Sequence, residues 1–158
     1  MGRVKMRTLS NACLFLRVFL FATAVPHLLR LKLTHVAGIL EPGSEPQTVD
    51  PDRARKIAAY VETAIIWGRP LVRAGCLTRG LTRYYFFRRA GLDVSLHFGM
   101  GRIGQQKEFD GHCWLVRDGE PYLEKQDPRN LYIEMYRISR TRKSTQTEGM
   151  GLGRLTNS

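Results

Sequence analysis

The chain has 158 residues, of which 43% are hydrophobic, and this suits one folded domain with a modest core. Its formal net charge of +11 lies mostly at the ends of the chain. Residues 1–38 hold six Lys/Arg and no Asp/Glu, and residues 139–158 hold four Lys/Arg and one Asp/Glu. Residues 39–138 hold 15 Lys/Arg and 13 Asp/Glu. Because the central part is nearly neutral, composition argues against a folded nucleic-acid-binding domain, and we expect no nucleic acid partner.

Residues 1–40 are predicted to form a basic, apolar helical segment. Within it, the apolar run over residues 9–31 contains an Ala-Thr-Ala sequence, Ala22 to Ala24, that is typical of a signal-peptidase site. Arg17 interrupts this run near its middle and opposes membrane insertion. We favour a helix that packs on the domain or lies at a membrane surface of a cytoplasmic protein, and a cleaved signal or an anchor is the alternative.

Residues 41–51 have the composition of a linker, with Pro, Gly and Ser but no periodicity. Asp50 and Pro51 fit the cap and the first position of the helix that follows. We therefore place the main domain at residues 52–138. The polar, Gly-rich and basic residues 139–158 are predicted to be a disordered tail.

Residues 74–91 have the pattern of one helix, which we expect to begin near Cys76 and to end at Gly91. A thiol at a helix N-terminus faces unpaired N–H groups and the positive end of the dipole, and both stabilise the thiolate. The same N–H groups can form an oxyanion hole. These features make Cys76 a candidate nucleophile, and the alternative is a small apolar residue in a helix interface.

The alternating residues 92–98 predict a strand, with His97 on its polar face. The Gly-rich residues 99–111 lack the Gly-Lys-Ser/Thr ending of a phosphate loop. A second strand begins near His112, and the Asp118-Gly119 turn after it predicts a hairpin.

His112 and Cys113 are neighbours in one strand, so their side chains point to opposite faces. We expect Cys113 to be a packed core thiol and Cys76 to be the partner of His112. Glu124 follows His112 by 12 residues, and a short hairpin can bring the two side by side. A carboxylate there would hold the imidazole of a general base, although this spacing alone is not specific.

The three cysteines do not form a metal or disulfide pattern. Their number is odd, their spacing is irregular and none forms a C-x-x-C pair; they are Cys13, Cys76 and Cys113. This argues against a disulfide framework and a structural zinc site, and we expect neither a metal nor another cofactor.

Two stretches carry a resemblance to a known family: "GCLTRGLTRYYFFRRAGLDVSLHFGMG" (Gly75 to Gly101) and "FDGHCWLVRDGEPYLE" (Phe109 to Glu124). In the order and spacing of these elements, the chain resembles the transglutaminase-like superfamily of papain-type cysteine enzymes. Within that superfamily it is most similar to the lasso peptide biosynthesis B proteins, which are leader peptidases. The resemblance implies an α+β fold in which N-terminal helices precede an antiparallel sheet, with the nucleophile at a helix N-terminus.

The resemblance also implies roles for individual residues. Cys76 matches the nucleophile of the family and His112 matches its base. The third member is commonly Asp, whereas this chain has Glu124 at the matching position, and Asp127 is near enough to be a substitute. The strand has His-Cys-Trp where the family usually has His-Ala-Trp, so Cys113 stands in place of an alanine.

The implied function is removal of the leader peptide from a ribosomally made lasso peptide precursor, through an acyl-enzyme. The implied partners are the precursor peptide, a lasso cyclase and a separate leader-recognition protein. We expect this split form because only about 50 residues precede the core helices, fewer than a recognition domain of roughly 80 residues needs.

Two other functions are compatible with the same residues. One is another acyl-transfer reaction, such as that of a transglutaminase or an amidase, because the triad chemistry is shared. The other is a catalytically inactive peptide-binding module, for which the departure at Glu124 is the argument.

Overall fold

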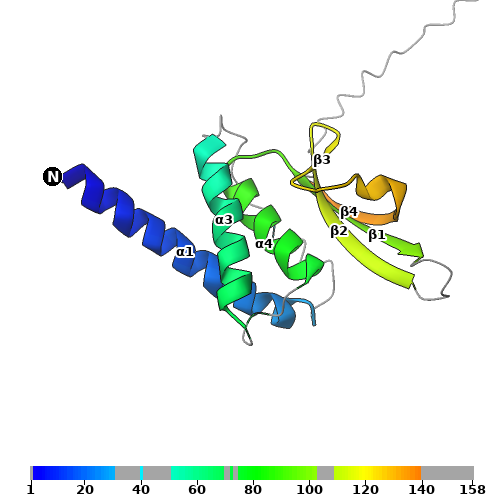
Figure 1. Ribbon diagram of the computed structural model, residues 1–158, viewed down its shortest axis with the longest axis horizontal. Coiled ribbons are helices and arrows are strands. Elements are labelled where there is room, and N and C mark those ends of the chain that lie inside the picture. Colours follow the sequence, from blue (N-terminus) through cyan, green and yellow to red (C-terminus); the bar gives the residue numbers. More distant parts are fainter. Residues whose placement is uncertain are drawn as a thin grey trace, which may run out of the picture.

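The computed structural model describes residues 2–30, 40, 51–69, 72, 75–102 and 109–139. Within these ranges the helices come first and the strands follow, and Figure 1 shows the helices on one side of the molecule and the sheet on the other. This confirms the predicted α+β class. The elements are α1 (Gly2–Leu28), α3 (Pro51–Trp67), α4 (Cys76–Arg89), β1 (Ser95–Arg102), β2 (Phe109–Arg117), β3 (Glu120–Tyr122), the 3-10 helix η1 (Pro128–Asn130) and β4 (Ile133–Ile138).

The sheet is antiparallel, with the strand order β3-β2-β1-β4. The predicted hairpin joins β2 to β3 through Asp118 and Gly119, whose φ angles of 52° and 84° are those of a type I′ turn. In the pairing of β1 with β2, Gly99 lies opposite His112. This register sets the strand position from which the imidazole projects.

The helix expected over residues 9–31 is present and extends further toward the N-terminus than the apolar run, because α1 begins at Gly2. Val18, Ala22 and Val25 recur at four- and three-residue steps, are fully buried and belong to one core together with side chains of α3 and α4. Burying a valine contributes about 1.5 kcal/mol or more, so this stripe contributes several kcal/mol to folding.

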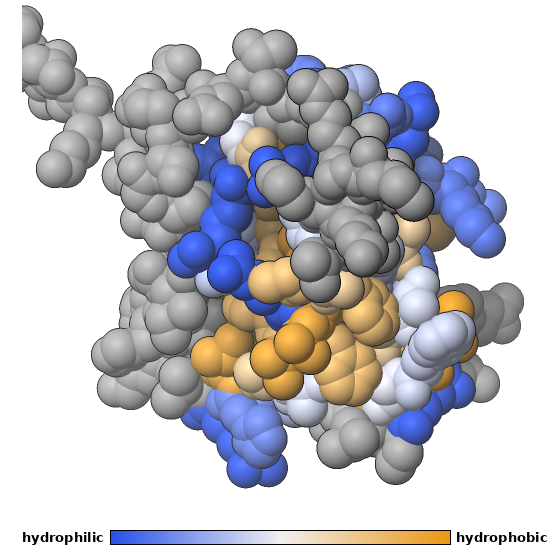
Figure 2. Space-filling view, turned by 90° about the vertical axis from the view of Figure 1, so that its left-hand side faces the viewer, coloured by the Kyte–Doolittle hydropathy of each residue, from blue (hydrophilic) through white to orange (hydrophobic). Residues whose placement is uncertain are grey.

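The opposite side of α1 remains hydrophobic and exposed. Figure 2 views the molecule from the side of the N-terminal end of α1 and shows hydrophobic side chains gathered near the middle of that face. Leu16 and Leu20 of α1 are more than half exposed. By length and composition Ser10–Leu28 meets the requirements of a membrane span, as signal sequences and core helices of soluble proteins also do.

α4 begins and ends where the sequence predicts. Its first residue is Cys76, and Gly91 follows its last turn with a φ of 93°. The Gly91 N–H donates to the Arg88 carbonyl and the Leu92 N–H donates to the Phe87 carbonyl, which is the Schellman pattern. The chain therefore turns sharply after α4 and enters β1.

His97 lies on the face of β1 that the sequence predicts, but it is buried. Its Nε2 is 2.8 Å from Ser95 Oγ, and its Nδ1 is 2.8 Å from Glu134 Oε2 on β4. The edge strand β4 therefore supplies a carboxylate that allows a polar ring to be buried. Of the predicted linker and tail, only Pro51, where α3 begins, and Ser139 lie among the described residues.

Candidate active site

Cys76 lies at the N-terminal tip of α4, where the helix meets the first residues of β2. The preceding Gly75 has an extended backbone, and no side chain in the described part of the chain caps the helix. The first intrahelical bond runs from the Arg79 N–H to the Gly75 carbonyl, at 3.1 Å, so the N–H groups of the first turn have no intrahelical acceptor. The partly buried thiol donates to the Gly111 carbonyl at 3.7 Å, just before His112 in β2.

The Cys76 thiol is strongly acidic in this environment. The side chain of Cys113, then its backbone N–H, and then the charge of His112 together lower the pKa of Cys76 to about 5, against the opposing effect of burial. The pKa of Cys113 is raised, because its S–H is held by the Cys76 sulfur and because the residue is buried. The pair therefore ionises at Cys76, the more exposed thiol.

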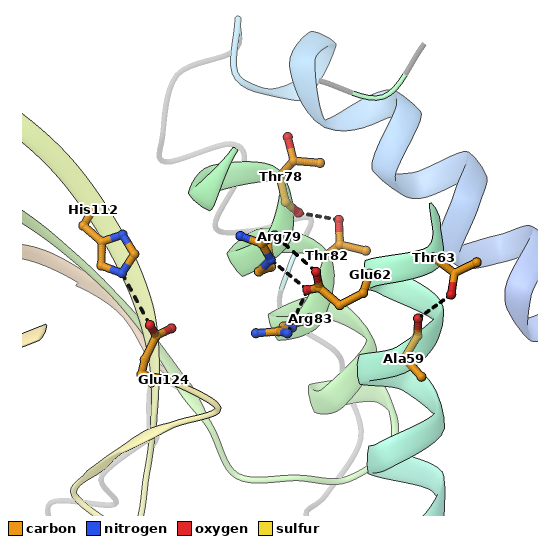
Figure 3. A network of polar contacts seen from close by, with 9 residues as sticks. All are labelled: Ala59, Glu62, Thr63, Thr78, Arg79, Thr82, Arg83, His112 and Glu124. Atoms are coloured by element: carbon orange, nitrogen blue, oxygen red, sulfur yellow. Dashed lines mark hydrogen bonds and ion pairs between the residues drawn. The ribbon is translucent and has the colours of Figure 1, made fainter. Parts of the chain in front are cut away.

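His112 and Glu124 lie side by side, as Figure 3 shows, with His112 Nε2 3.5 Å from Glu124 Oε2. Both side chains are about one quarter exposed, so their charges are partly shielded from water. This arrangement leaves Nδ1 as the ring nitrogen that does not face the carboxylate.

The contact between His112 and Glu124 depends on a local turn after β3. In the β2–β3 ladder Leu115 lies opposite Tyr122, so a continued ladder would place Glu124 opposite Cys113. Leu123 instead has a φ of 63°, in the left-handed region that few non-glycine residues adopt. The strand ends there, and the chain turns so that Glu124 reaches His112.

Asp127, the substitute predicted for Glu124, is engaged elsewhere. Its carboxylate accepts the Arg129 N–H at 2.9 Å, which caps η1, and also the Arg129 guanidinium at 2.6 Å. These hydrogen bonds from Arg129 lower the pKa of Asp127. Glu124 is therefore the carboxylate that accompanies His112 in this structure.

Aromatic rings restrict the orientation of His112. Its ring centroid is 6.2 Å from that of Trp114, at 16°, and 5.0 Å from that of Tyr132, at 31°. Tyr132 is held in turn by a hydrogen bond from its hydroxyl to Asp110 at 3.0 Å. The sequence analysis did not identify Tyr132, because it is brought to His112 only by the pairing of β4 with β1.

The Cys76, His112 and Glu124 side chains line one cavity of about 770 Å³. Figure 3 shows Arg79 and Arg83 on the side of α4 that faces His112 and Glu124. Both arginines line the same cavity and share the carboxylate of Glu62 from α3. The sequence analysis missed this group, although Arg79 and Arg83 follow Cys76 by three and seven residues and thus share its helix face.

The assembled groups have the chemistry of acyl transfer. An acidic thiol can attack a carbonyl, an imidazole held by a carboxylate can move protons, and the free N–H groups of a helix tip can stabilise an oxyanion. Among the residues that the structure describes, no group of three or more His, Cys, Asp or Glu side chains is placed to hold a metal ion.

The comparisons with known proteins agree with this arrangement. The model of the Transglutaminase-like superfamily matches residues 18–137, and this superfamily includes cysteine peptidases and acyltransferases. The match begins within α1 and extends into β4, so it covers the helices and the sheet together. No match was found to a curated protein or to a solved structure. The chain belongs to the transglutaminase-like superfamily.

Proposed function

We propose that this protein is a cysteine peptidase that removes the leader from a ribosomally made lasso peptide precursor. The observation that carries the proposal is the acidic Cys76 thiol beside His112, whose Nε2 faces Glu124. The membership of the superfamily supports cysteine hydrolase or acyltransferase chemistry. The choice of substrate follows from the resemblance of residues 75–101 and 109–124 to lasso peptide B proteins.

In this mechanism the resting pair is the Cys76 thiolate and protonated His112. The thiolate attacks the scissile carbonyl carbon, and the N–H groups of the first turn of α4 stabilise the oxyanion. His112 gives its proton to the leaving amine as the C–N bond breaks, which leaves a thioester on Cys76. His112 then takes a proton from water, which attacks the thioester and releases the carboxylic acid.

Glu124 holds the imidazole during these proton transfers. By facing Nε2 at 3.5 Å, its carboxylate favours the tautomer in which Nδ1 is available to the thiol, and it stabilises the imidazolium. General acid–base catalysis of this kind contributes about 10²- to 10⁴-fold to a rate.

The partners in this proposal are the precursor peptide, a separate leader-recognition protein and a lasso cyclase that uses the released core. The reaction takes place in the cytoplasm. The exposed side of α1, which includes Leu16 and Leu20, provides contact with the membrane surface.

The test is incubation of the purified protein with the precursor peptide and the recognition protein that are encoded beside it, followed by mass spectrometry. We expect release of the leader, loss of release with Cys76→Ala and with His112→Ala, and unchanged release with Cys13→Ala, the exposed cysteine of α1. Absence of cleavage by the parent protein contradicts the proposal. A product in which an added amine replaces water at the acyl group would favour the transglutaminase-type reaction.

A further inference from the structure

The wall of the cavity opposite His112 carries two arginines and one carboxylate. Arg79 Nε is 2.7 Å from Glu62 Oε1, and Arg83 Nη2 is 2.8 Å from the same oxygen. Arg79 Nη2 also donates to Glu62 Oε2 at 3.2 Å. One carboxylate therefore serves two guanidinium groups, and among the described residues one positive charge has no partner of its own.

Arg83 is the more deeply buried of the two arginines. Its side chain is 12% exposed, against 40% for Arg79, and its Nε is buried without a hydrogen-bond partner among the described residues. Burial lowers the pKa of Arg83, against the effect of Glu62. A buried guanidinium that lacks full pairing is costly, so a second anion in the cavity would be stabilised there.

The other charged groups of the cavity do not cancel the one positive charge that remains after Glu62 pairs with Arg79 and Arg83. Lys125 adds a third cation to the lining, while Glu124 is next to His112. In the proposed resting state the imidazolium and the Lys125 ammonium together balance the charges of Glu124 and of the Cys76 thiolate. The arginines therefore make the wall opposite His112 positive, in a site that is partly closed to water.

We propose that Arg79 and Arg83 form a subsite that binds a carboxylate of the peptide substrate. The proposal rests on the proposed function in one respect, namely that the substrate is a peptide whose scissile carbonyl is attacked by Cys76. Because α4 rises 1.5 Å per residue, Arg83 lies about 10 Å along the helix from Cys76, the length of about three extended residues. The acidic side chain is therefore expected within about three residues of the scissile bond.

The test uses a matched pair of alkylating reagents in place of a peptide substrate. N-iodoacetyl-glutamate α-amide and N-iodoacetyl-glutamine α-amide differ only in one carboxylate. Their rates at Cys76 are compared by peptide mapping, with the exposed Cys13 of the same chain as internal control. Since both reagents consume the same thiolate, their rate ratio does not depend on the pKa of Cys76.

We expect the ratio of the glutamate rate to the glutamine rate to be about fivefold or more higher at Cys76 than at Cys13, which corresponds to roughly 1 kcal/mol. Arg79→Gln and Arg83→Gln should each reduce this preference. Glu62→Gln should increase it, because it frees both guanidinium groups. Arg83→Lys is the conservative control and should retain part of the preference, as a cation without the planar fork.

A ratio at Cys76 equal to that at Cys13, or one that neither arginine variant changes, would overturn the subsite. If Arg83→Gln fails to fold, Arg79→Gln decides the matter, because Arg79 is substantially exposed. The alkylation readout needs no peptide cleavage. If the precursor is not cleaved but the glutamate reagent is still preferred at Cys76, the peptidase function is wrong and the subsite stands. If the precursor is cleaved but the two reagents react equally, only the subsite is wrong.

Discussion

Cys113 acts on Cys76 from the face of β2 that packs against α4, and its side chain is the largest cause of the lowered pKa of Cys76. His112 is its neighbour in the strand and lies on the opposite face, yet both residues line the cavity at Cys76. The tip of α4 therefore meets β2 at a point where Cys76 is within reach of side chains from both faces of the strand. A residue expected to be only a packed core thiol thus also stabilises the proposed nucleophile.

Replacing Cys113 with alanine should raise the pKa of Cys76 from about 5 toward that of an ordinary thiol, because the thiolate loses its main hydrogen-bond donor. Since the thiolate is the reactive form, alkylation by iodoacetamide should fall below pH 7 and recover at higher pH. The measurement is the rate at Cys76 as a function of pH, and its midpoint should move upward by about one unit or more.

The control for this change is Cys13→Ala, which removes an exposed thiol on α1 and should leave the midpoint unchanged. If the midpoint with Cys113→Ala stays near pH 5, then the backbone N–H of residue 113, His112 and the helix tip account for the acidity of Cys76 without the Cys113 thiol.

Glu124→Gln should lower kcat for precursor cleavage by about 10²-fold, with a smaller effect on KM, because the amide cannot stabilise the imidazolium. Asp127→Asn is the matched control, since Asp127 is held by Arg129 and should leave kcat within about twofold. The opposite result, a normal rate with Glu124→Gln and a large loss with Asp127→Asn, would show that the chain rearranges after β3 when substrate binds.

Local signals predicted the elements that position Cys76 and His112. Gly91 ends α4 with a left-handed backbone, and Asp118-Gly119 forms the hairpin turn, because these conformations depend mainly on the residues that adopt them. The proximity of Glu124 to His112 was also predicted, because a short hairpin can bring together two residues that are 12 positions apart. The left-handed turn at Leu123, which makes the contact, has no sequence signal.

The remaining parts of the site depend on tertiary packing. Glu62 meets Arg79 and Arg83 only because α3 packs against α4, and no spacing in the sequence encodes that contact. The strand β4 was not predicted, and in the structure only Ile138 of its six residues is buried. Its contribution to the burial of His97 therefore became visible only in the structure.

Gly80→Ala should destabilise the protein, although alanine normally stabilises a helix interior by about 1 kcal/mol relative to glycine. A Cβ at position 80 would lie 2.8 Å from Cys113 Sγ and 3.1 Å from Leu96 Cδ1, so either these packed side chains or α4 must shift. We expect a net loss of about 1–2 kcal/mol in the free energy of unfolding, measured with urea, together with slower alkylation of Cys76.

Gly111→Ala is the control for this substitution, because a Cβ there meets no atom within 4 Å. It should leave the free energy of unfolding unchanged within about 0.5 kcal/mol or raise it slightly. Equal stability of Gly80→Ala and Gly111→Ala would contradict the close approach of α4 to β2.

Val18→Ala tests whether α1 is part of the folded core. Val18 is fully buried against α3 and α4, so the change removes buried methyl groups and leaves a small cavity. We expect a loss of about 2 kcal/mol in the free energy of unfolding by urea titration. Leu20→Ala removes a larger side chain from the same helix, but Leu20 is 59% exposed, and its effect should stay within about 0.5 kcal/mol. If the two variants lose the same stability, or if Val18→Ala loses none, then α1 does not pack on the domain as described, and its exposed and buried sides have no distinct roles.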